Sequence, residues 1–486
     1  MDLVHKLKFW FAMTGMLAAP LQAWADVSQS SHVAPTVMPD EVRPLGGSID
    51  SVPRMTETVA PSTAQTIALD DALLQENPAL FAQVLSRAVE QQAWDVVAHL
   101  IPLYQQVNPR DETLLLFAQA RLYHVKGHYA QAIEHYRTIL NQQAELTPVR
   151  MYLAQALFEN QDNEAAQFQF EKIQADHPPE PVFNLVTQYL DALQRRSNWR
   201  LDGSVNYLND DNVNNASSDK KIRVNGAYTG FQLNDASMPQ SGKGLSYGLN
   251  IAKDFLVSGH HALITGVNLN GKYYSNLDGY DDVIARVNVG YQWRTARQSI
   301  ALIPFYQKRW FAGRAYSDTY GVRLNGSYLI APNWQVAGGY EYGENRYEAR
   351  DFLNGQYHFV SLSSSYTLNA QTQLFAGVDT MLDQTQDASD SSLRVGYRMG
   401  LIRDFPLNVS AQVQLGVANK LFDAVNFFGV RRDEREYGGT VTLWNRGWYW
   451  YGVMPKLNFE FTNTRSNISM YSYQKNRVYL TLDRRF

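Results

Sequence analysis

The segment from Leu407 to Val417 alternates between apolar and polar residues over eleven positions. Its apolar positions are Leu407, Val409, Ala411, Val413, Leu415 and Val417, and small or polar residues lie between them. Successive side chains of a strand point to opposite faces, so this segment separates an apolar from a polar environment. Its length exceeds the usual soluble strand of about five or six residues and matches the roughly 9–11 that a tilted strand needs to cross a bilayer.

The same alternation recurs through the second half of the chain, for example at 283–293 and 322–330. A bilayer tolerates strands only in a closed barrel, because an open edge would leave unpaired backbone groups in hydrocarbon. The pattern predicts fourteen barrel strands, near 220–232, 244–255, 262–274, 281–294, 298–309, 318–330, 333–345, 356–368, 371–382, 391–403, 406–418, 435–445, 448–462 and 475–486. A fifteenth candidate, 199–207, is interpreted as a lead-in, because two chain ends on one side of the membrane require an even strand number.

The predicted connections differ in length at the two ends of the barrel. Those at 295–297, 331–332 and 445–447 are short, and those at 311–317, 382–391, 420–434 and 463–474 are long. Outer-membrane barrels have short periplasmic turns and long external loops. Applied backward from the C-terminus, this rule predicts that the strand at 220–232 runs outward and begins the barrel.

The last predicted strand places Val478, Leu480, Leu482 and Phe486 on one face, with Phe486 as the final residue given. This arrangement resembles the C-terminal signal by which outer-membrane barrels are recognised for insertion. It departs from that signal at Arg484, where an apolar or aromatic residue is usual. An arginine near a membrane interface costs only about 0–1 kcal/mol, so the departure is tolerable at a strand end.

Composition narrows the class of protein further. A formal net charge of −4 gives no reason to expect nucleic acid as a partner, and the absence of cysteine excludes disulfides and thiolate metal sites. The mean hydropathy of −0.35 is low for a helical membrane protein but suits an alternating barrel.

The first residues are typical of a signal peptide. Lys6 and Lys8 precede a short apolar run at 9–19, and Ala23-Trp24-Ala25 fits a small-x-small cleavage site, so residues 1–25 are predicted to be removed. Residues 26–67 carry five prolines among Ser, Thr and Val and too few large apolar residues for a core, which predicts a disordered linker.

Residues 68–197 change to a helical period with an internal repeat of 34 residues. Ala120 and Ala132 recur as Ala154 and Ala166, and Tyr136 recurs as Phe170. A helix–turn–helix unit of this length resembles the tetratricopeptide repeat, with Tyr123, Gly127 and Tyr136 in the first copy. Small residues at the shared positions allow close helix approach and the aromatic residues fill the remaining gaps. The two readings of this region are a concave partner-binding groove and a plain helical stalk.

Motifs for catalysis are missing from the sequence. It has no G-x-S-x-G, H-E-x-x-H or phosphate-binding loop, and we predict neither an enzyme nor a cofactor or metal site. The pair His260-His261 is expected in a periplasmic turn with its side chains pointing apart, and His124 and His128 are expected on the groove or surface. Arg286, Arg294 and Arg323 lie at polar positions and are expected to line the lumen.

One polar segment is more specific. Asp210-Asp211-Asn212-Val213-Asn214-Asn215-Ala216-Ser217 follows Val205-Asn206-Tyr207 where helices give way to the barrel. Asn and Asp favour turns, so a plain polar loop is the simplest interpretation. Behind a signal peptide and a short repeat domain, however, this segment resembles the surface lipoprotein assembly modulator (Slam) family. The resemblance marks Asn212, Val213, Asn214 and Asn215 as the family motif.

The resemblance implies an α plus membrane-β fold: a periplasmic tetratricopeptide solenoid followed by an outer-membrane barrel at 198–486 of about fourteen strands. It further implies delivery of specific lipoproteins or related secreted proteins to the cell surface. The expected partners are that protein cargo, outer-membrane lipids, the barrel-assembly machinery and periplasmic chaperones. The alternative is an exopolysaccharide export porin, which also pairs such repeats with a barrel but usually carries many more of them.

Overall fold

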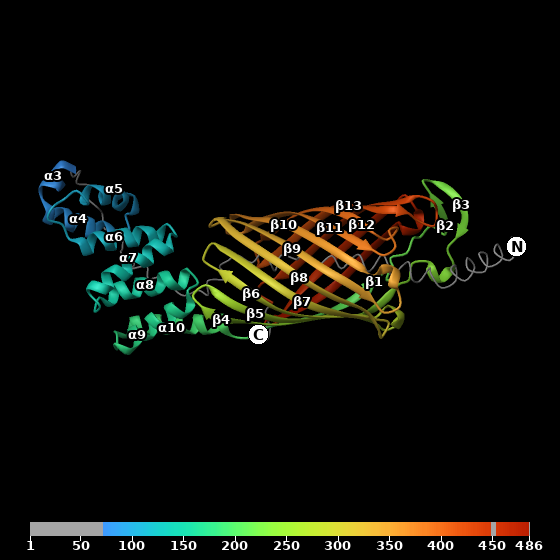
Figure 1. The fold of residues 1–486 in the computed structure, drawn as a ribbon, viewed down its shortest axis with the longest axis horizontal. Helices are drawn as coiled ribbons and strands as arrows, with labels where there is room; N and C mark the ends of the chain where they lie inside the picture. Colours follow the sequence, from blue (N-terminus) through green and yellow to red (C-terminus); the bar gives the residue numbers. More distant parts are fainter. Residues whose placement is uncertain (1–70, 449–452, 486) are drawn as a thin grey trace.

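The computed structural model describes residues 71–448 and 453–485, and it divides into a helical domain and a β-barrel that lie end to end (Figure 1). The predicted signal peptide, the whole of the predicted linker at 26–67 and the terminal Phe486 lie outside the described residues. The described helices are α3 (Asp71–Glu76), α4 (Pro78–Glu90), α5 (Trp94–Tyr104), α6 (Glu112–Val125), α7 (Tyr129–Gln142), α8 (Thr147–Glu159), α9 (Asn163–Ala175) and α10 (Glu180–Ser197). Among them, none is both long and apolar enough to span a membrane.

The helical domain is built from antiparallel pairs, and α6–α7 and α8–α9 are the two copies of the 34-residue repeat. The Asp111 side chain caps α6 by accepting a hydrogen bond from the Leu114 amide at 3.0 Å. Gly127 adopts a φ of +70° in the turn before α7, a conformation that favours glycine. The predicted packing positions lie in one core: Ala120, Ala132, Tyr136, Ala154, Ala166 and Phe170 are fully buried, and Tyr123 packs against them half-buried.

Within the described residues, fourteen antiparallel strands form one closed barrel. They are β1 (Arg200–Asp210), β4 (Gly242–Ser258), β5 (His261–Tyr274), β6 (Asp282–Arg294), β7 (Gln298–Phe311), β8 (Arg314–Ala331), β9 (Trp334–Tyr347), β10 (Gly355–Asn369), β11 (Thr372–Thr385), β12 (Ser392–Asp404), β13 (Val409–Val425), β14 (Arg431–Asn445), β15 (Val453–Ser466) and β16 (Tyr473–Arg485). Each strand pairs with its neighbours along the chain, and β1 closes the barrel against β16.

The strand that begins the barrel differs from the prediction. The segment interpreted as a lead-in is β1, which pairs with both β4 and β16. The predicted first strand at 220–232 is instead a separate hairpin of β2 (Lys221–Val224) and β3 (Ala227–Gln232) outside the barrel wall (Figure 1). The exchange keeps the strand number even, so the predicted total of fourteen is confirmed.

Two predicted connections are also corrected. Leu407 and Asn408 both have a φ of +61°, so they form a turn, and the alternating strand begins at Val409. The predicted long loop at 311–317 is a tight hairpin turn, because Ala312 and Gly313 take positive φ and Phe311 already pairs with Arg314. Positive φ at both central residues is the geometry that matches strand twist.

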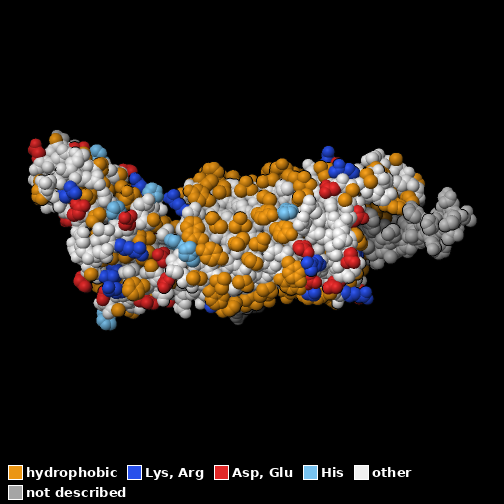
Figure 2. Space-filling view, in the orientation of Figure 1, with side chains coloured by type: hydrophobic (Ala, Val, Ile, Leu, Met, Phe, Trp, Pro, Cys, Tyr) orange, Lys and Arg blue, Asp and Glu red, His pale blue; other side chains and the backbone are white. Residues whose placement is uncertain are grey.

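The barrel is apolar outside and polar inside. Alternate residues such as Val287, Leu324 and Leu415 are exposed on the outer wall, and Figure 2 shows apolar side chains as a broad band around it. Charged side chains gather beyond this band, toward the end away from the helical domain (Figure 2). We call that end the far rim and the end beside the helical domain the near rim.

Candidate functional site

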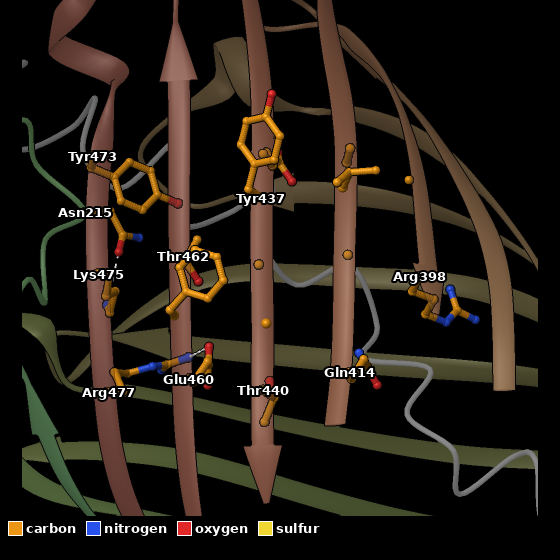
Figure 3. Close-up of a pocket in the computed structure, with 18 of the residues that line it drawn as sticks. Asn215, Arg398, Gln414, Tyr437, Thr440, Glu460, Thr462, Tyr473, Lys475 and Arg477 are labelled. Carbon is orange, nitrogen blue, oxygen red and sulfur yellow. Dashed lines mark hydrogen bonds and ion pairs between the residues drawn. The ribbon is translucent and has the colours of Figure 1, made fainter. Parts of the chain in front are cut away.

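The candidate site is a cavity of about 460 Å³ inside the barrel (Figure 3). Its walls come from strands at opposite ends of the chain order, because the barrel is closed by β1 and β16. The charged side chains that line it are Lys272, Asp282, Arg309, Asp379, Arg394, Arg398, Glu436, Glu460, Lys475 and Arg477. A cavity with so many charges is suited to a polar chain rather than an apolar ligand.

Most of these charges pair with a neighbour on the wall. Asp379 accepts from Arg394 at 2.6 Å and from Arg398 at 2.8 Å, and Arg394 also reaches Glu436 at 2.9 Å. Arg477 pairs with Glu460, as Figure 3 shows. Pairing offsets the cost of holding charges away from bulk water, so the lumen wall is a stable polar surface.

A second charged cluster lies on β6, β8, β9 and β10. Glu341, only 1% exposed, lies 3.1 Å from Arg286 and 2.5 Å from Arg323. Tyr357 donates a third hydrogen bond to the same carboxylate at 2.6 Å. Two of the three arginines expected in the lumen therefore share one carboxylate, and the third, Arg294, lies 4.0 Å from Asp254 nearer the near rim.

The asparagine segment predicted as a motif is buried at the far rim, where it joins β1 to the cavity. Asn212, Val213 and Asn214 are 3%, 3% and 1% exposed, and Val213 and Asn215 line the cavity. The Lys475 ammonium contacts Asp210 at 2.8 Å and the Asn215 side-chain oxygen at 3.1 Å. Figure 3 shows Asn215 directly beside Lys475. The segment is therefore part of the lumen wall and not a solvated loop.

Its side-chain amides hold the backbone together. Asn212 donates to the carbonyls of Ala216 at 2.8 Å and Gln474 at 3.1 Å, and it accepts from the Ala216 amide at 2.9 Å. Asn214 bridges to Met238 and Gln240 in the same way, at 2.9 and 3.0 Å. Asparagine suits both positions because its side chain donates and accepts at once.

Residues 211–241, which we call the far-rim cap, also lie across the junction of β1 and β16. The β1–β16 ladder runs from Asp202 to Tyr207, then resumes only at Asp210. Beyond it, the Asp211 carboxylate accepts from the Asn476 amide of β16 at 3.1 Å. The hairpin of β2 and β3 adds contacts to the loop before β16. Val224 forms a β-bridge with Ile468, and Ile222 and Leu233 pack against Ile468 and Tyr471.

The near rim contacts the turns of the helical repeats. Arg297 donates to the Lys126 carbonyl at 3.1 Å, and a side chain at Gly127 would lie 3.1 Å from the Arg297 guanidinium. Asn160 lies 3.4 Å from the His260 ring. Burial lowers the pKa of His260 from its ordinary value, although the Asp162 carboxylate acts to raise it. The α6–α7 and α8–α9 turns thus fix the helical domain against the barrel.

The histidines singled out in the sequence have separate structural roles. His260 faces Asn160 while His261 stacks on Tyr291, so their rings have different partners. His124 is buried at 8% exposure and bonds Glu159 at 3.2 Å, so its interpretation as a groove or surface residue is wrong. A helix-end residue facing inward cannot be told from one facing outward by the repeat spacing alone. The described residues contain no group of three or more His, Cys, Asp or Glu placed to hold a metal ion.

The predicted C-terminal signal residues of the barrel lie on its outer wall. Val478, Leu480 and Leu482 are exposed together on the outer face of β16, between 42% and 47%. Sequence reasoning did not find Glu341, Lys475 or the ion pair between Lys475 and Asp210, although all three residues lie at inward positions of the alternating pattern. The hairpin of β2 and β3 carried a strand pattern with no mark to separate it from the barrel.

Fold and site together define an outer-membrane β-barrel protein with a helical repeat domain on its near side. The model of the surface lipoprotein assembly modifier family matches residues 199–486, and the model of that family's N-terminal tetratricopeptide repeats matches residues 67–170. The chain belongs to this family. It lies in the outer membrane, with the helical domain and near rim in the periplasm and the far rim outside.

Several relatives share this architecture over most of their length. Surface lipoprotein assembly modifier 2 of Haemophilus influenzae is 33% identical, and the match covers 96% of each chain. Surface lipoprotein assembly modifier 1 of Neisseria meningitidis is 28% identical, covering 87% of this chain and 86% of that one. The hemophilin secretion modulator of Acinetobacter baumannii is 23% identical, covering 85% and 87%.

Among solved structures, the outer-membrane channel DcaP of Acinetobacter baumannii aligns with 60% of this chain and 96% of its own, at 10% identity and a TM-score of 0.34. This likeness is too low to support any conclusion about function.

Proposed function

We propose that this protein delivers specific lipoproteins or related secreted proteins across the outer membrane to the cell surface. The main observation behind the proposal is that the repeats and the barrel both match this family and that the repeats contact the near rim of the barrel. Relatives named as surface lipoprotein assembly modifiers and as a hemophilin secretion modulator support both kinds of cargo. The exopolysaccharide alternative has no comparable support.

The helical domain offers a contact surface for cargo. The Arg121 guanidinium lies 3.9 Å from the centre of the Tyr152 ring and 5.4 Å from that of Trp94, so one row joins α5, α6 and α8. All three side chains are half-buried. Aromatic and arginine side chains dominate binding energies at protein interfaces, so we propose this row as the periplasmic docking site.

The lumen then serves as the conduit. A barrel of this size lies between eight-stranded barrels filled by side chains and 16–18-stranded barrels with an aqueous channel. Its wall charges are paired, so an extended chain can replace those pairs one at a time. The far-rim cap lies at the exit, where Asp211 and Asn212 hold it to β16. Passage requires release of the cap or opening of the β1–β16 junction beside it.

Photo-crosslinking in cells tests the conduit. A crosslinking residue at Lys272 faces the cavity, whereas one at the adjacent Tyr273 faces lipid. We expect position 272, and not 273, to capture the exported protein, which mass spectrometry then identifies. A crosslinker at Tyr152 should capture the same species. Cargo attached at 152 but never at 272 would place the passage outside the lumen.

A disulfide across the cap tests its release. The chain has no cysteine, so the paired substitutions D211C and N476C create a single bridge. Oxidation should stop surface display of the captured cargo, and reductant should restore it. F311C with R314C is the matched control, because it bridges a far-rim hairpin that is already paired. Equal display from the oxidised cap would show that cargo does not leave through it.

A cargo that is locked in its folded state tests whether cargo passes through the lumen unfolded or whether the barrel only anchors the helical domain. A cargo locked by its own periplasmic disulfide cannot pass a fourteen-stranded lumen, so display should require reductant. Equal display in both conditions would make the barrel an anchor for a periplasmic chaperone. The barrel-assembly machinery and periplasmic chaperones remain proposed partners.

A further inference from the structure

We propose that Arg431, Arg435 and Arg465 form a binding site for the phosphate of an outer-leaflet lipid. The arginines lie on the outward face of β14 and β15 at the far rim. Their neighbours Glu434, Glu436 and Thr464 are buried on the lumen side, so alternation turns the arginines outward. All three are exposed. This site does not depend on the proposed transport function.

The register places two of these arginines directly opposite each other. Arg435 pairs with Arg465 across the β14–β15 ladder. Side chains at such positions have Cβ atoms roughly 4.5–5.5 Å apart, and like charges there are destabilising. A sheet that keeps this pair has its charges close enough for one anion to contact both.

One carboxylate, that of the exposed Asp433, lies between Arg431 and Arg435 on the same face of β14, so the patch keeps a net positive charge. Within the described part of the chain, none of the three arginines lies within 4.0 Å of a carboxylate oxygen. Arg431 donates its Nε to the Phe422 carbonyl at 3.0 Å, which leaves its terminal nitrogens available. Two other outward cations of the far rim differ, since Arg346 pairs with Glu344 at 2.9 Å and Lys308 with Asp318 at 3.0 Å.

The surface next to the arginines identifies the ligand as a lipid. Toward the membrane centre, and beyond Asn463 on β15, the outward positions include Tyr437, Phe461, Val417 and Leu415, all exposed. They continue the outward apolar positions of β13, β14 and β15, such as Val441, Leu443 and Phe459, which are exposed as well. An anion held above such a wall must carry apolar chains to cover it, which free phosphate lacks.

Guanidinium groups suit a phosphate monoester in particular. Arginine binds phosphate through two parallel hydrogen bonds, and two facing guanidiniums can share its oxygens. The Arg465 guanidinium lies 5.8 Å from the Tyr437 ring centre, which places it over the apolar wall. We therefore assign the site to a phosphorylated glycolipid of the outer leaflet.

Native mass spectrometry of the full-length protein in detergent tests the assignment, with bis-phosphorylated lipid A and its dephosphorylated form as probes. Wild-type protein should retain the phosphorylated form. The R435Q/R465Q variant should bind it on the order of tenfold more weakly, because two surface cations are lost. R346Q is the matched control, since that arginine already has a carboxylate partner, and it should bind as the wild type does.

Three results would overturn the site. They are unchanged lipid A binding by R435Q/R465Q, equal wild-type binding of the dephosphorylated glycolipid, and displacement of lipid A by an equal concentration of inorganic phosphate. The gel shift on boiling shows whether each variant has folded. If the double variant does not fold, the headgroup comparison on wild-type protein decides the question alone.

Discussion

The helical domain and the barrel bury opposite kinds of residue. In the helical domain, Ala132, Tyr136 and Phe170 are fully buried, and most of the core is apolar. In the barrel, Glu341 and Asp210 are buried at 1% and 0%, while Leu415 is 54% exposed. The two regions of the chain therefore follow opposite burial patterns, because water surrounds the helical domain and lipid surrounds the barrel.

The difference shows which interactions hold each region. Close packing stabilises the repeats, so a change of one or two methyl groups matters there. The barrel wall is held by its backbone ladder, and its interior depends on charge pairing. Changes of volume and changes of charge should thus have separate effects in the two regions.

The largest expected effect is on the barrel. Glu341→Ala leaves Arg286 and Arg323 without their shared carboxylate. Removing one partner of a buried ion pair costs about 3–5 kcal/mol, and water in the lumen should place this loss near the lower figure. The urea midpoint of the barrel should fall while the helical domain is unchanged. Glu344→Ala, in an exposed pair with Arg346, should cost no more than about 1 kcal/mol.

A change of volume should act on the helical domain. Ala132→Leu overpacks a fully buried position and should destabilise the domain by about 1–3 kcal/mol. Ala130→Leu is exposed on the same helix and should remain within about 0.5 kcal/mol of wild type. We predict that residues 69–196 fold alone, so thermal melting of that fragment measures both variants. The full-length variants should still insert their barrels, and loss of insertion would show that the two regions are not independent.

Cap stability should respond to the asparagine segment. Asn212→Ala removes the bonds to Ala216 and Gln474 and should cost about 1–3 kcal/mol locally. Faster hydrogen exchange at the outer end of β16 would report it. Asn209→Ala changes an exposed outward residue of β1 and should leave exchange unaltered. Identical exchange in both variants would contradict the assigned role of the cap.

The smallest effect concerns the joint between the two regions. Burial holds the pKa of His260 below 6.5, against the opposing Asp162 carboxylate and together with the neighbouring His261. We expect undocking to expose the His260 ring, so that the docked state binds fewer protons than the undocked state and docking weakens as the pH falls below about 6.5. Spin labels at Glu164 and Ser258 should separate in acid. His260→Gln should remove this dependence, and persistence of the dependence would assign it to another group.

The sequence predicts the periodic parts of the fold well. Alternation such as that at 283–293 identifies barrel strands, and the recurrence of Ala120 and Ala132 identifies the repeats. It could not separate β2 and β3 from the barrel, because the pattern of a short hairpin is the same as that of a strand. The ion pair of Arg286 with Glu341 joins side chains of β6 and β9, which are not neighbouring strands, and a local sequence pattern cannot predict such a long-range contact. The asparagine segment was found by resemblance, but its burial against β16 needed the structure.

The junction of β1 and β16 has a consequence for biogenesis. The barrel closes through residues near 202–210 and 477–485, the two extremes of its sequence. Every other ladder joins strands that follow one another or are separated only by the cap hairpin. A growing sheet therefore keeps two open edges until its final strand arrives, and such edges readily pair with other chains. The helical domain, which precedes the sheet and has its core formed by its own helices, can be complete while the membrane part is still an open sheet.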